Sequence, residues 1–352
     1  MIGHSYQLHQ LKRFSGNDEL TKLCDALRFE LKEDESKEPL TDTAFFSEIE
    51  FFQTAMNQVI NLESNRDCLE ANISDEFSCA LYDEVYYEFY NDENIHALRE
   101  NLPQLIALYK LLNDTHYQTN IQDLRRLMDV PNQIFVLAYY QKRLIGAIWA
   151  MEEGGLSPAL TEAVFNGIRR PKGNLVAQML VGQSYFPEAM LQRSVRISRI
   201  SVIAPLRRLG IGHSMVRFLE SKVEMFVNFI SVSFGLTQDL LFFWESIGYQ
   251  IVHLGFHLDK TTGLHSAVVL KSLGDELSQE WIQEAIQKFG VDALLNLSHR
   301  EYRAETTKIL QEKAQEGVFD VRDQAVIDAH HNWKRALHTV KNAFLRAELA
   351  KE

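Results

Sequence analysis

The chain has 352 residues, of which 46% are hydrophobic and 24% are charged, and its formal net charge is −12. This composition is typical of a globular protein with two or three structural units. The acidic balance argues against a surface that binds nucleic acid everywhere, although a local basic patch remains compatible with it. No apolar run approaches the ~20 residues of a bilayer-spanning helix, and residues 1–16 lack a signal-peptide core, so we expect a cytoplasmic protein without membrane contact.

The three cysteines, Cys24, Cys68 and Cys79, are scattered and have no CxxC spacing. This pattern favours neither a disulfide framework nor a zinc site. We therefore expect no metal centre.

The first 95 residues are predicted to contain little regular core. Residues 5–24 alternate like a strand and turn helical at Asn17, and an acidic stretch at 32–39 reads as a linker before a helical pattern at 45–62. An aromatic and acidic run follows at 83–93. Two interpretations stay open: a solvated helical insert, or a docking surface for a separate partner chain.

Residues 96–128 predict helices, because Leu98, Leu102, Leu105 and the leucines after them recur at helical spacing. His116 and Tyr117 follow in a polar stretch. A histidine titrates near neutral pH and can accept a proton, whereas a tyrosine can donate one to a leaving group. The structural alternative is that His116 caps a helix end and Tyr117 packs.

A basic loop follows two predicted strands, at 133–140 and 144–152, and a predicted helix at 158–167. It carries Arg169, Arg170 and Lys172, and its proline and glycine exclude a regular element. These cations suit contacts to RNA backbone or to a cofactor phosphate, with a solvated turn as the alternative. Asn174 could read a base edge or serve as the N-cap of the next helix.

A strand, a glycine turn and a helix follow one another from residue 196 to 225. The turn reads Arg207-x-x-Gly210-x-Gly212, a pattern in which backbone N–H groups and the positive end of the next helix converge on a phosphate. Arg207 and Arg208 can add charge-assisted hydrogen bonds. A strand at 229–234 and a helix at 237–248 complete a βαβα unit.

The remaining residues predict two strands, at 250–258 and 263–270, and then helices only. The expected helices are 280–289, 292–297, 300–317 and 324–349. The last of them carries Lys334, Arg335, His338, Lys341 and Arg346. This bundle either binds RNA or covers the preceding module.

The glycine turn, the strand after it and the segment Phe242-Phe-Trp-Glu-Ser-Ile-Gly-Tyr249 resemble the acetyl-CoA site of the GNAT acetyltransferases. Four segments, at 153–157, 169–178, 196–202 and 231–235, resemble more narrowly the bacterial tRNA(Met) cytidine acetyltransferase family, TmcA. The resemblance implies an α/β GNAT acyl-CoA N-acyltransferase fold, with a central mixed sheet, flanking helices, a helical N-terminal insert and a helical C-terminal bundle. It also implies that the strand before the turn splays from its neighbour and holds pantetheine.

The same resemblance implies acetyl transfer from acetyl-CoA to the N4 amine of a tRNA cytidine, the wobble cytidine of elongator tRNA(Met). His116 and Tyr117 would move protons, and Arg169, Arg170, Lys172 and Asn174 would contact the RNA. The expected cofactor-binding residues are Ile200, Ser201, Val202, Arg207, Arg208, Leu209, Gly210, Ile211, Gly212, His213 and Asp239.

Several positions depart from the family pattern. Ile203 replaces a histidine, Asp239 replaces a glutamate, and Ser246 stands where relatives place a basic residue expected to meet coenzyme A. Losing one charged contact weakens binding by ~1.5–3 kcal/mol. The sequence also lacks GxxxxGK[ST], so an ATPase phosphate loop cannot be built from it. We expect a chain shortened at its N-terminus, with the helicase-like module lost or supplied by a separate partner.

The expected domains are therefore 1–95, the end of a helicase-like module with an acidic helical insert; 96–272, the GNAT domain; and 273–352, a helical tail and candidate tRNA-binding region. Two other functions stay open. The chain could be a GNAT enzyme that acetylates a protein or a small amine. Alternatively, it could be a shortened, non-catalytic paralogue that binds coenzyme A or tRNA.

Overall fold

The computed structural model describes residues 85–113, 121–274, 276–317, 320–333 and 335–349. The predictions for residues 1–84 and for His116 and Tyr117 lie outside these ranges. Contacts divide the chain into two compact units: residues 1–147 with 200–215, and residues 148–199 with 216–352. This division cuts through the expected GNAT domain, and the three-domain boundaries stay a prediction.

The described strands form a seven-stranded mixed sheet in the order β1-β2-β3-β4-β5-β7-β6. β4 and β5 are parallel, whereas β1 with β2, β5 with β7, and β6 with β7 are antiparallel. This sheet, with helices along it, confirms the predicted fold class. The strands are β1 Val85–Tyr90, β2 Gln133–Tyr140, β3 Arg143–Gly154, β4 Arg193–Val202, β5 Phe229–Gly235, β6 Gln250–Leu258 and β7 His265–Ser272.

The described helices include several short ones. They are α4 Ile95–Glu100, α5 Leu102–Asn113, α6 Ile121–Asp129, α7 Pro158–Phe165, α8 Leu175–Ser184, α9 Glu188–Leu191, α10 Ile211–Val223, α11 Gln238–Glu245, α12 Glu276–His299, α13 Ala304–Lys313, α14 Val321–Trp333 and α15 Lys341–Leu349, with 3₁₀ turns η1 Ala204–Leu206 and η2 Leu337–Thr339.

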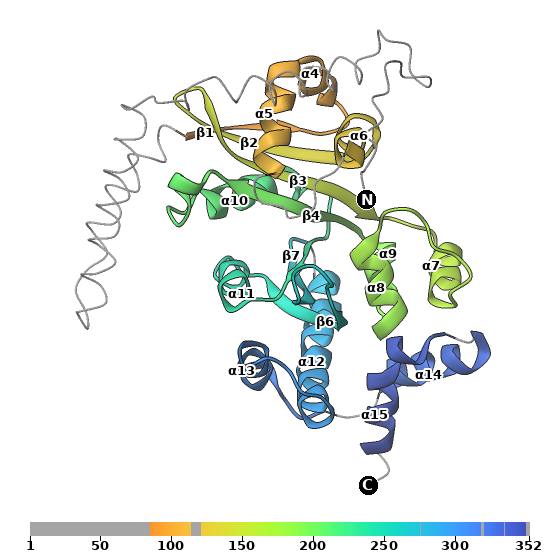
Figure 1. Ribbon diagram of the computed structural model, residues 1–352. Helices are drawn as coiled ribbons and strands as arrows, with labels where there is room; N and C mark the ends of the chain where they lie inside the picture. Colours follow the sequence, from red (N-terminus) through yellow and green to blue (C-terminus); the bar gives the residue numbers. More distant parts are fainter. Residues whose placement is uncertain (1–84, 114–120, 275, 318–319, 334, 350–352) are drawn as a thin grey trace, which may run out of the picture. The chain divides into compact units, whose positions relative to one another are not determined.

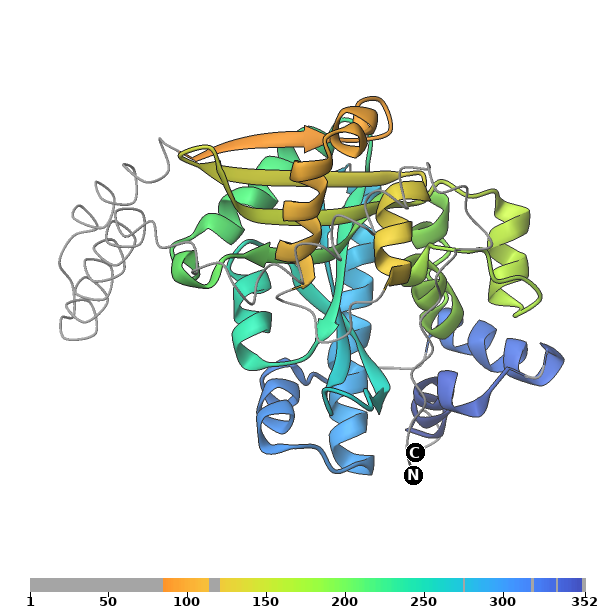
Figure 2. The ribbon, with the colours of Figure 1, turned by 45° about the horizontal axis from the view of Figure 1, so that its top comes forward.

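In the first unit, α5 lies across the strands β1 and β2 (Figures 1 and 2). All eight residues of β2 are buried, which explains why this segment reads as an apolar run. Leu105 and Leu108 of α5 are fully buried in this core. The Gln104 amide nitrogen lies 2.6 Å from the Tyr139 hydroxyl and 2.7 Å from a Glu88 carboxylate oxygen. Polar side chains thus fix the helix on the strands.

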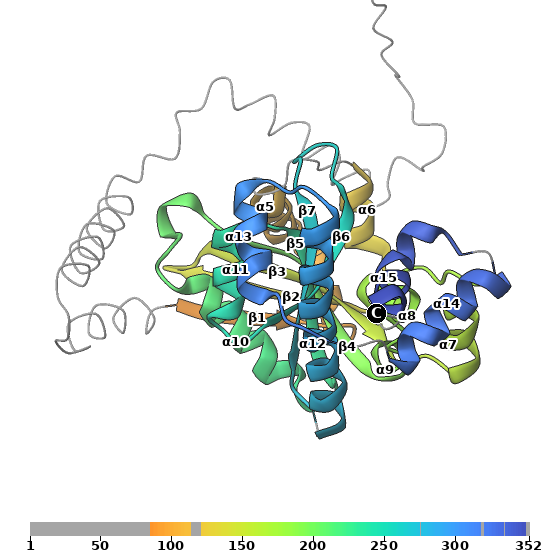
Figure 3. The ribbon, with the colours of Figure 1, turned by 90° about the horizontal axis from the view of Figure 1, so that it is seen from below.

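In the second unit, the 24-residue helix α12 packs against β6, β7, α13 and α15 (Figure 3). Its Trp281 is 1% exposed, stacks edge-on against Phe229 of β5 and contacts Phe186. A tryptophan buried in this way contributes a large apolar area to the core. The helix therefore joins the sheet to the C-terminal helices.

The structure corrects two helix predictions. Segments 280–289 and 292–297 belong to one helix, α12. Gly290, which lies between the two predicted segments, is a close-packing site, since a Cβ there would lie 2.5 Å from Cγ of Gln315. The predicted helix 324–349 is two helices, α14 and α15, with η2 between them. At the break, Arg335 donates to the carbonyl oxygen of Phe165, a contact the local sequence does not encode.

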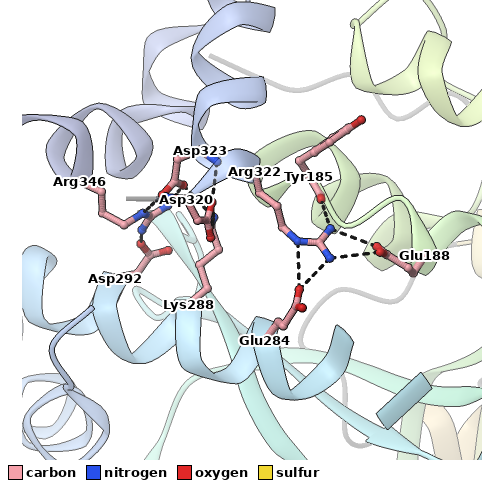
Figure 4. Close-up of polar contacts among 9 residues, drawn as sticks. All are labelled: Tyr185, Glu188, Glu284, Lys288, Asp292, Asp320, Arg322, Asp323 and Arg346. Carbon is pink, nitrogen blue, oxygen red and sulfur yellow. Dashed lines mark hydrogen bonds and ion pairs between the residues drawn. The ribbon is translucent and has the colours of Figure 1, made fainter. Parts of the chain in front are cut away.

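Two ion clusters fasten the C-terminal helices within the second unit (Figure 4). Arg346 donates twice to Asp323, at 2.7 and 2.8 Å, and also contacts Asp292, and Lys288 contacts Asp323 at 2.8 Å. Burial raises the pKa of Asp323 to about 6, against the attraction of Lys288. Burial lowers the pKa of Arg346 to about 10, so both groups are charged at pH 7.

The second cluster centres on Arg322 of α14. Its guanidinium contacts Glu188 and Glu284 and donates to the carbonyl oxygen of Tyr185 at 2.7 Å. Acidic side chains therefore neutralise both Arg322 and Arg346. These two arginines hold the tail in place, which makes them poor candidates for contacts to another molecule.

Candidate active site: a glycine turn at the end of β4

The glycine turn lies between β4 and α10 in the first unit. Arg208 and Gly210 have positive φ angles, 66° and 78°. The first intrahelical bond of α10 is donated by Ser214 to Gly210, so the N–H groups of Ile211 and Gly212 precede it. N–H groups at a helix start have no intrahelical acceptor and suit an anion. The backbone of the turn thus has the form the sequence predicts for a phosphate site.

The side chains of the turn divide between core and solvent. Leu206, Leu209 and Ile211 are buried, whereas Arg207 and Arg208 are exposed. The buried residues anchor the turn, and the arginines lie at its surface. The Arg207 Nε donates to the carbonyl oxygen of Val202 at 2.9 Å, which ties the turn to the end of β4.

Gly146 of β3 allows the helix after the turn to approach the sheet. A Cβ at this position would lie 2.9 Å from Sδ of Met215 and 3.2 Å from the carbonyl oxygen of Ser201. A larger residue would therefore push α10 away from β3, and the turn would move with the helix.

Ser201 links β4 to the helix that precedes the predicted catalytic pair. Its hydroxyl is buried and donates to the carbonyl oxygen of Leu111 at 2.9 Å. Leu111 stands five residues before His116. Five residues span at most ~18 Å, so the chain tethers His116 within that distance of this anchor.

The parallel ladder between β4 and β5 is short. It joins residues 194–197 to residues 229–232. Ser198 and Arg199 continue β4, and residues 233–235 continue β5 while pairing with β7. In the described part of the chain, the facing edges of β4 and β5 thus continue past their last pairing. The pantetheine site that the sequence resemblance implies at these edges stays a prediction.

Glu153 organises a polar cluster in the second unit that sequence reasoning did not assign. Its carboxylate is buried and accepts N–H bonds from Leu175 at 2.9 Å and Val176 at 3.3 Å, at the start of α8. It also pairs with Arg196 of β4 at 2.6 Å. Negative charge at a helix start is stabilising. In the sequence, the position of Glu153 immediately before Gly154 and Gly155 was the signal of a special role. The residues that it contacts are 22 to 43 positions away in the chain.

The predicted substrate loop is held by its backbone and extends its cations into solvent. Gln178 donates to the carbonyl oxygens of Pro171 and Gly173, at 2.8 and 2.6 Å. Arg169, Arg170 and Lys172 are exposed. The ion pairs of the described residues include none of these three cations. The loop is therefore an ordered basic surface.

Asn174 has a structural role. Its side-chain oxygen accepts a hydrogen bond from the Gly154 backbone at 2.7 Å, and its φ of 53° places it in the left-handed region at the start of α8. It precedes the helix, as the N-cap alternative expected, but makes no side-chain cap bond. The bond to Gly154 uses only the side-chain oxygen, so contact between the amide group and a base edge stays a prediction.

The remaining predicted positions have the following surroundings. Asp239 is exposed in the first turn of α11, a position that stabilises negative charge, and His213 is half-buried in the first turn of α10. The Ser246 hydroxyl donates to the carbonyl oxygen of Phe243. Ile203 donates its backbone N–H to Ile145. The backbone N–H groups of Ile203 and Ser246 thus both have hydrogen-bond partners, although these two side chains differ from the family pattern.

Metal-binding groups and membrane-spanning helices are both missing from the residues that the structure describes. Among residues 85–113, 121–274, 276–317, 320–333 and 335–349, no group of three or more His, Cys, Asp or Glu side chains is placed to hold a metal ion. Within the same ranges, no helix is both long and apolar enough to cross a bilayer.

Comparison with known families agrees with the fold. Residues 215–274, which follow the glycine turn, match the family model described as GNAT acetyltransferase 2. Together with the mixed sheet, this match supports an α/β GNAT fold.

About half of the chain is also similar to TmcA proteins. The chain is 42% identical over 196 residues to the tRNA(Met) cytidine acetyltransferase TmcA of Actinobacillus pleuropneumoniae, covering 54% of this chain and 33% of that protein. It is 44% identical over 169 residues to TmcA of Haemophilus influenzae, covering 48% of this chain and 25% of that protein. The chain thus spans between a quarter and a third of the length of these relatives.

Solved structures are far more distant. Arabidopsis thaliana NAA60 in complex with acetyl-CoA is 12% identical, with a TM-score of 0.36, over 53% of this chain and 98% of that protein. A likeness at this level adds nothing to the assignment.

Proposed function

We propose that this chain is an acetyltransferase that transfers the acetyl group of acetyl-CoA to the N4 amine of a tRNA cytidine. The observation that carries the proposal is the glycine turn at the start of α10, within a chain about 42% identical to TmcA proteins over half its length. The reaction would take place in the cytoplasm, where tRNA and acetyl-CoA meet.

The residues of the turn fit the diphosphate of coenzyme A. Two positive φ angles turn the backbone, the N–H groups of Ile211 and Gly212 precede the first helical bond, and Arg207 and Arg208 are exposed beside them. The ladder that ends at Ile197 leaves strand edges that suit the amides of pantetheine. When bound, acetyl-CoA supplies the activated acetyl thioester.

His116 and Tyr117 are our candidates for proton transfer. The amine of a cytosine must lose a proton as it is acylated, and a histidine can take it. The leaving thiolate must gain a proton or be stabilised, and a tyrosine hydroxyl can donate one. The anchor between Ser201 and Leu111 supports this assignment, since it fixes the chain five residues before His116.

The exposed loop of Arg169, Arg170 and Lys172 is our candidate for RNA contact. Its backbone is ordered by Gln178, so the three cations are positioned before RNA arrives. Phosphate contacts of this kind position RNA without reading its sequence.

The decisive experiment incubates the purified chain with labelled acetyl-CoA and bulk tRNA, with and without ATP, followed by nucleoside analysis. We expect labelled N4-acetylcytidine. Dependence on an added ATPase would indicate that the helicase-like module acts as a separate partner. Label in protein or small amines, with unlabelled tRNA, would establish a different acceptor, and absence of any transfer would identify a non-catalytic paralogue.

A pair of glycine variants tests the cofactor site separately. Gly210 and Gly167 both have positive φ, 78° and 74°, so alanine strains each backbone by ~1–2 kcal/mol. We expect Gly210→Ala to weaken acetyl-CoA binding ~10-fold or more, and Gly167→Ala, in a surface turn after α7, to leave it unchanged. Equal affinities for both variants in calorimetry would reject the phosphate role of the turn.

A further inference from the structure

A small cavity in the second unit has no role in the proposed reaction. It lies between β6, the end of α12 and the start of α15, and its volume is ≈ 40 Å³. We call it the Arg300 cavity. Its polar and charged lining includes His253, Asp292, Asn296, Arg300, Lys341, Asn342 and Arg346.

The charges around this cavity are unbalanced. Asp292 and Asp323 neutralise Arg346, which leaves the positive charges of Arg300 and Lys341 unbalanced. The ion pairs of the described residues include neither Arg300 nor Lys341. Two cations without an acidic partner thus share one small cavity, an arrangement that like-charge repulsion disfavours.

Packing against an aromatic ring holds these two cations in place. The Arg300 guanidinium lies 4.2 Å from the centre of the Phe256 ring and 5.3 Å from that of Tyr302. The ammonium of Lys341 lies 5.7 Å from the centre of the same Phe256 ring. Cation–π contacts fix the position of a charge without neutralising it.

One donor of Arg300 is unsatisfied. Its Nη1 atom is buried and has no hydrogen-bond partner among the described residues. A buried donor of this kind costs free energy unless a ligand or water accepts from it. The side-chain amides of Asn296 and Asn342 line the same cavity and offer further donors.

The geometry points to a binding site for a phosphate group, held by Arg300 and Lys341. A volume of ≈ 40 Å³ has room for about three water-sized atoms, which suits the oxygens of one tetrahedral oxyanion and is too small for a base or a sugar. Guanidinium and ammonium groups are the usual partners of phosphate. The phosphate can come from free inorganic phosphate or from an RNA backbone.

The titration of a neighbouring histidine agrees with a positive field. Burial lowers the pKa of His265, and the charges of Arg300 and Arg303 lower it further. The hydrogen bond to the carbonyl oxygen of Gly255 raises the same pKa. A site of this potential attracts anions.

The test measures binding of inorganic phosphate to the full chain by calorimetry and thermal shift, with sodium chloride at matched ionic strength as the reference. We expect saturable binding and a concentration-dependent rise in Tm. Arg300→Gln and Lys341→Gln should each weaken binding ~10-fold or more, because each removes a charged contact. The matched control is Lys260→Gln, which makes the same charge change at an exposed residue outside the cavity lining.

A second arm distinguishes the two sources of phosphate. An RNA hexamer without terminal phosphates either displaces inorganic phosphate, which identifies a backbone phosphodiester as the occupant, or leaves it bound, which identifies the free ion. Both results support the site. It is overturned if wild type shows no saturable phosphate effect beyond chloride, or if Lys260→Gln loses as much affinity as the two cavity variants. Should Arg300→Gln fail to fold, Lys341→Gln carries the comparison. The acetyl-transfer assay is independent of this result.

Discussion

At the scale of single residues, burial changes the pH at which a side chain becomes charged. Burial lowers the pKa of His253 to about 4, and the side chain lines a cavity with Arg300, Lys341, Arg346 and Asp292. In the unfolded chain a histidine has its ordinary pKa of about 6.5. The unfolded state therefore binds a proton first as the pH falls, while the folded state keeps His253 neutral.

The first prediction follows from this difference. The contribution of neutral, buried His253 to the free energy of unfolding is fully present above pH ~6.5. As the pH falls towards 4, the free energy of unfolding decreases progressively, by at most ~3 kcal/mol. Denaturant unfolding at several pH values should show this slope, and His253→Gln should flatten it. As a control, His257→Gln changes an exposed residue of the same strand and should keep the slope. The raised pKa of Asp323 acts in the opposite direction over this range, so the result that would contradict the expectation is an equal pH dependence in wild type and His253→Gln.

The second prediction at this scale concerns Glu153. Its carboxylate is buried, caps α8 and pairs with Arg196, so Glu153→Gln removes the charge that both partners need. Breaking a buried ion pair is strongly destabilising, and we expect a loss of ~2–4 kcal/mol in the free energy of unfolding. Urea denaturation measures it. Glu162→Gln, an exposed acid on α7, should change stability by less than ~0.5 kcal/mol.

At the scale of elements, the bond between Ser201 and Leu111 joins β4 to α5. Ser201→Ala removes the donor to a buried carbonyl oxygen and should cost ~1 kcal/mol of stability. Because the affected segment leads to His116, we expect kcat for acetyl transfer to fall ~10-fold, with KM for acetyl-CoA little changed. Steady-state kinetics separate the two parameters. A raised KM with normal kcat would place Ser201 in cofactor binding alone.

Local patterns predicted the strands better than the helices of the tail. The predicted ranges 133–140 and 250–258 match β2 and β6, since apolar runs of strand length bounded by turns are local signals. The predicted division of the tail into helices was wrong for two reasons. Gly290 lies inside a helix and packs closely against Gln315, and Arg335 donates to the carbonyl oxygen of Phe165 at a break between two helices. Both causes are contacts between distant residues, which periodicity does not contain.

The site divides in the same way. The glycine turn was predictable, since Gly210 and Gly212 mark it within six residues and a helix start follows. The role of Glu153 and the anchor from Ser201 to Leu111 were not, because their partners lie 22 to 90 residues away. His116 and Tyr117 stay predictions.

At the scale of the whole chain, the C-terminal helices depend on buried charge. Asp323 is fully buried and contacts both Arg346 and Lys288. Asp323→Asn removes the buried charge that these two cations share and leaves them only Asp292 and Asp320 as acidic partners. We expect a loss of ~3–5 kcal/mol, measured by denaturation. Asp328→Asn, an exposed acid on the same helix, is the matched control and should be nearly neutral. Equal losses would mean that helix α14 is held by its apolar face instead.

The short ladder between β4 and β5 has a consequence for amide exchange with heavy water. Ser198 and Arg199 continue β4 beyond its last pairing with β5, in the middle of a sheet whose other strands protect one another. An occupant that bonds the edge of β4 facing β5 at this point should slow the exchange of its amide hydrogens. Deuterium uptake in this stretch therefore reports occupancy without any turnover.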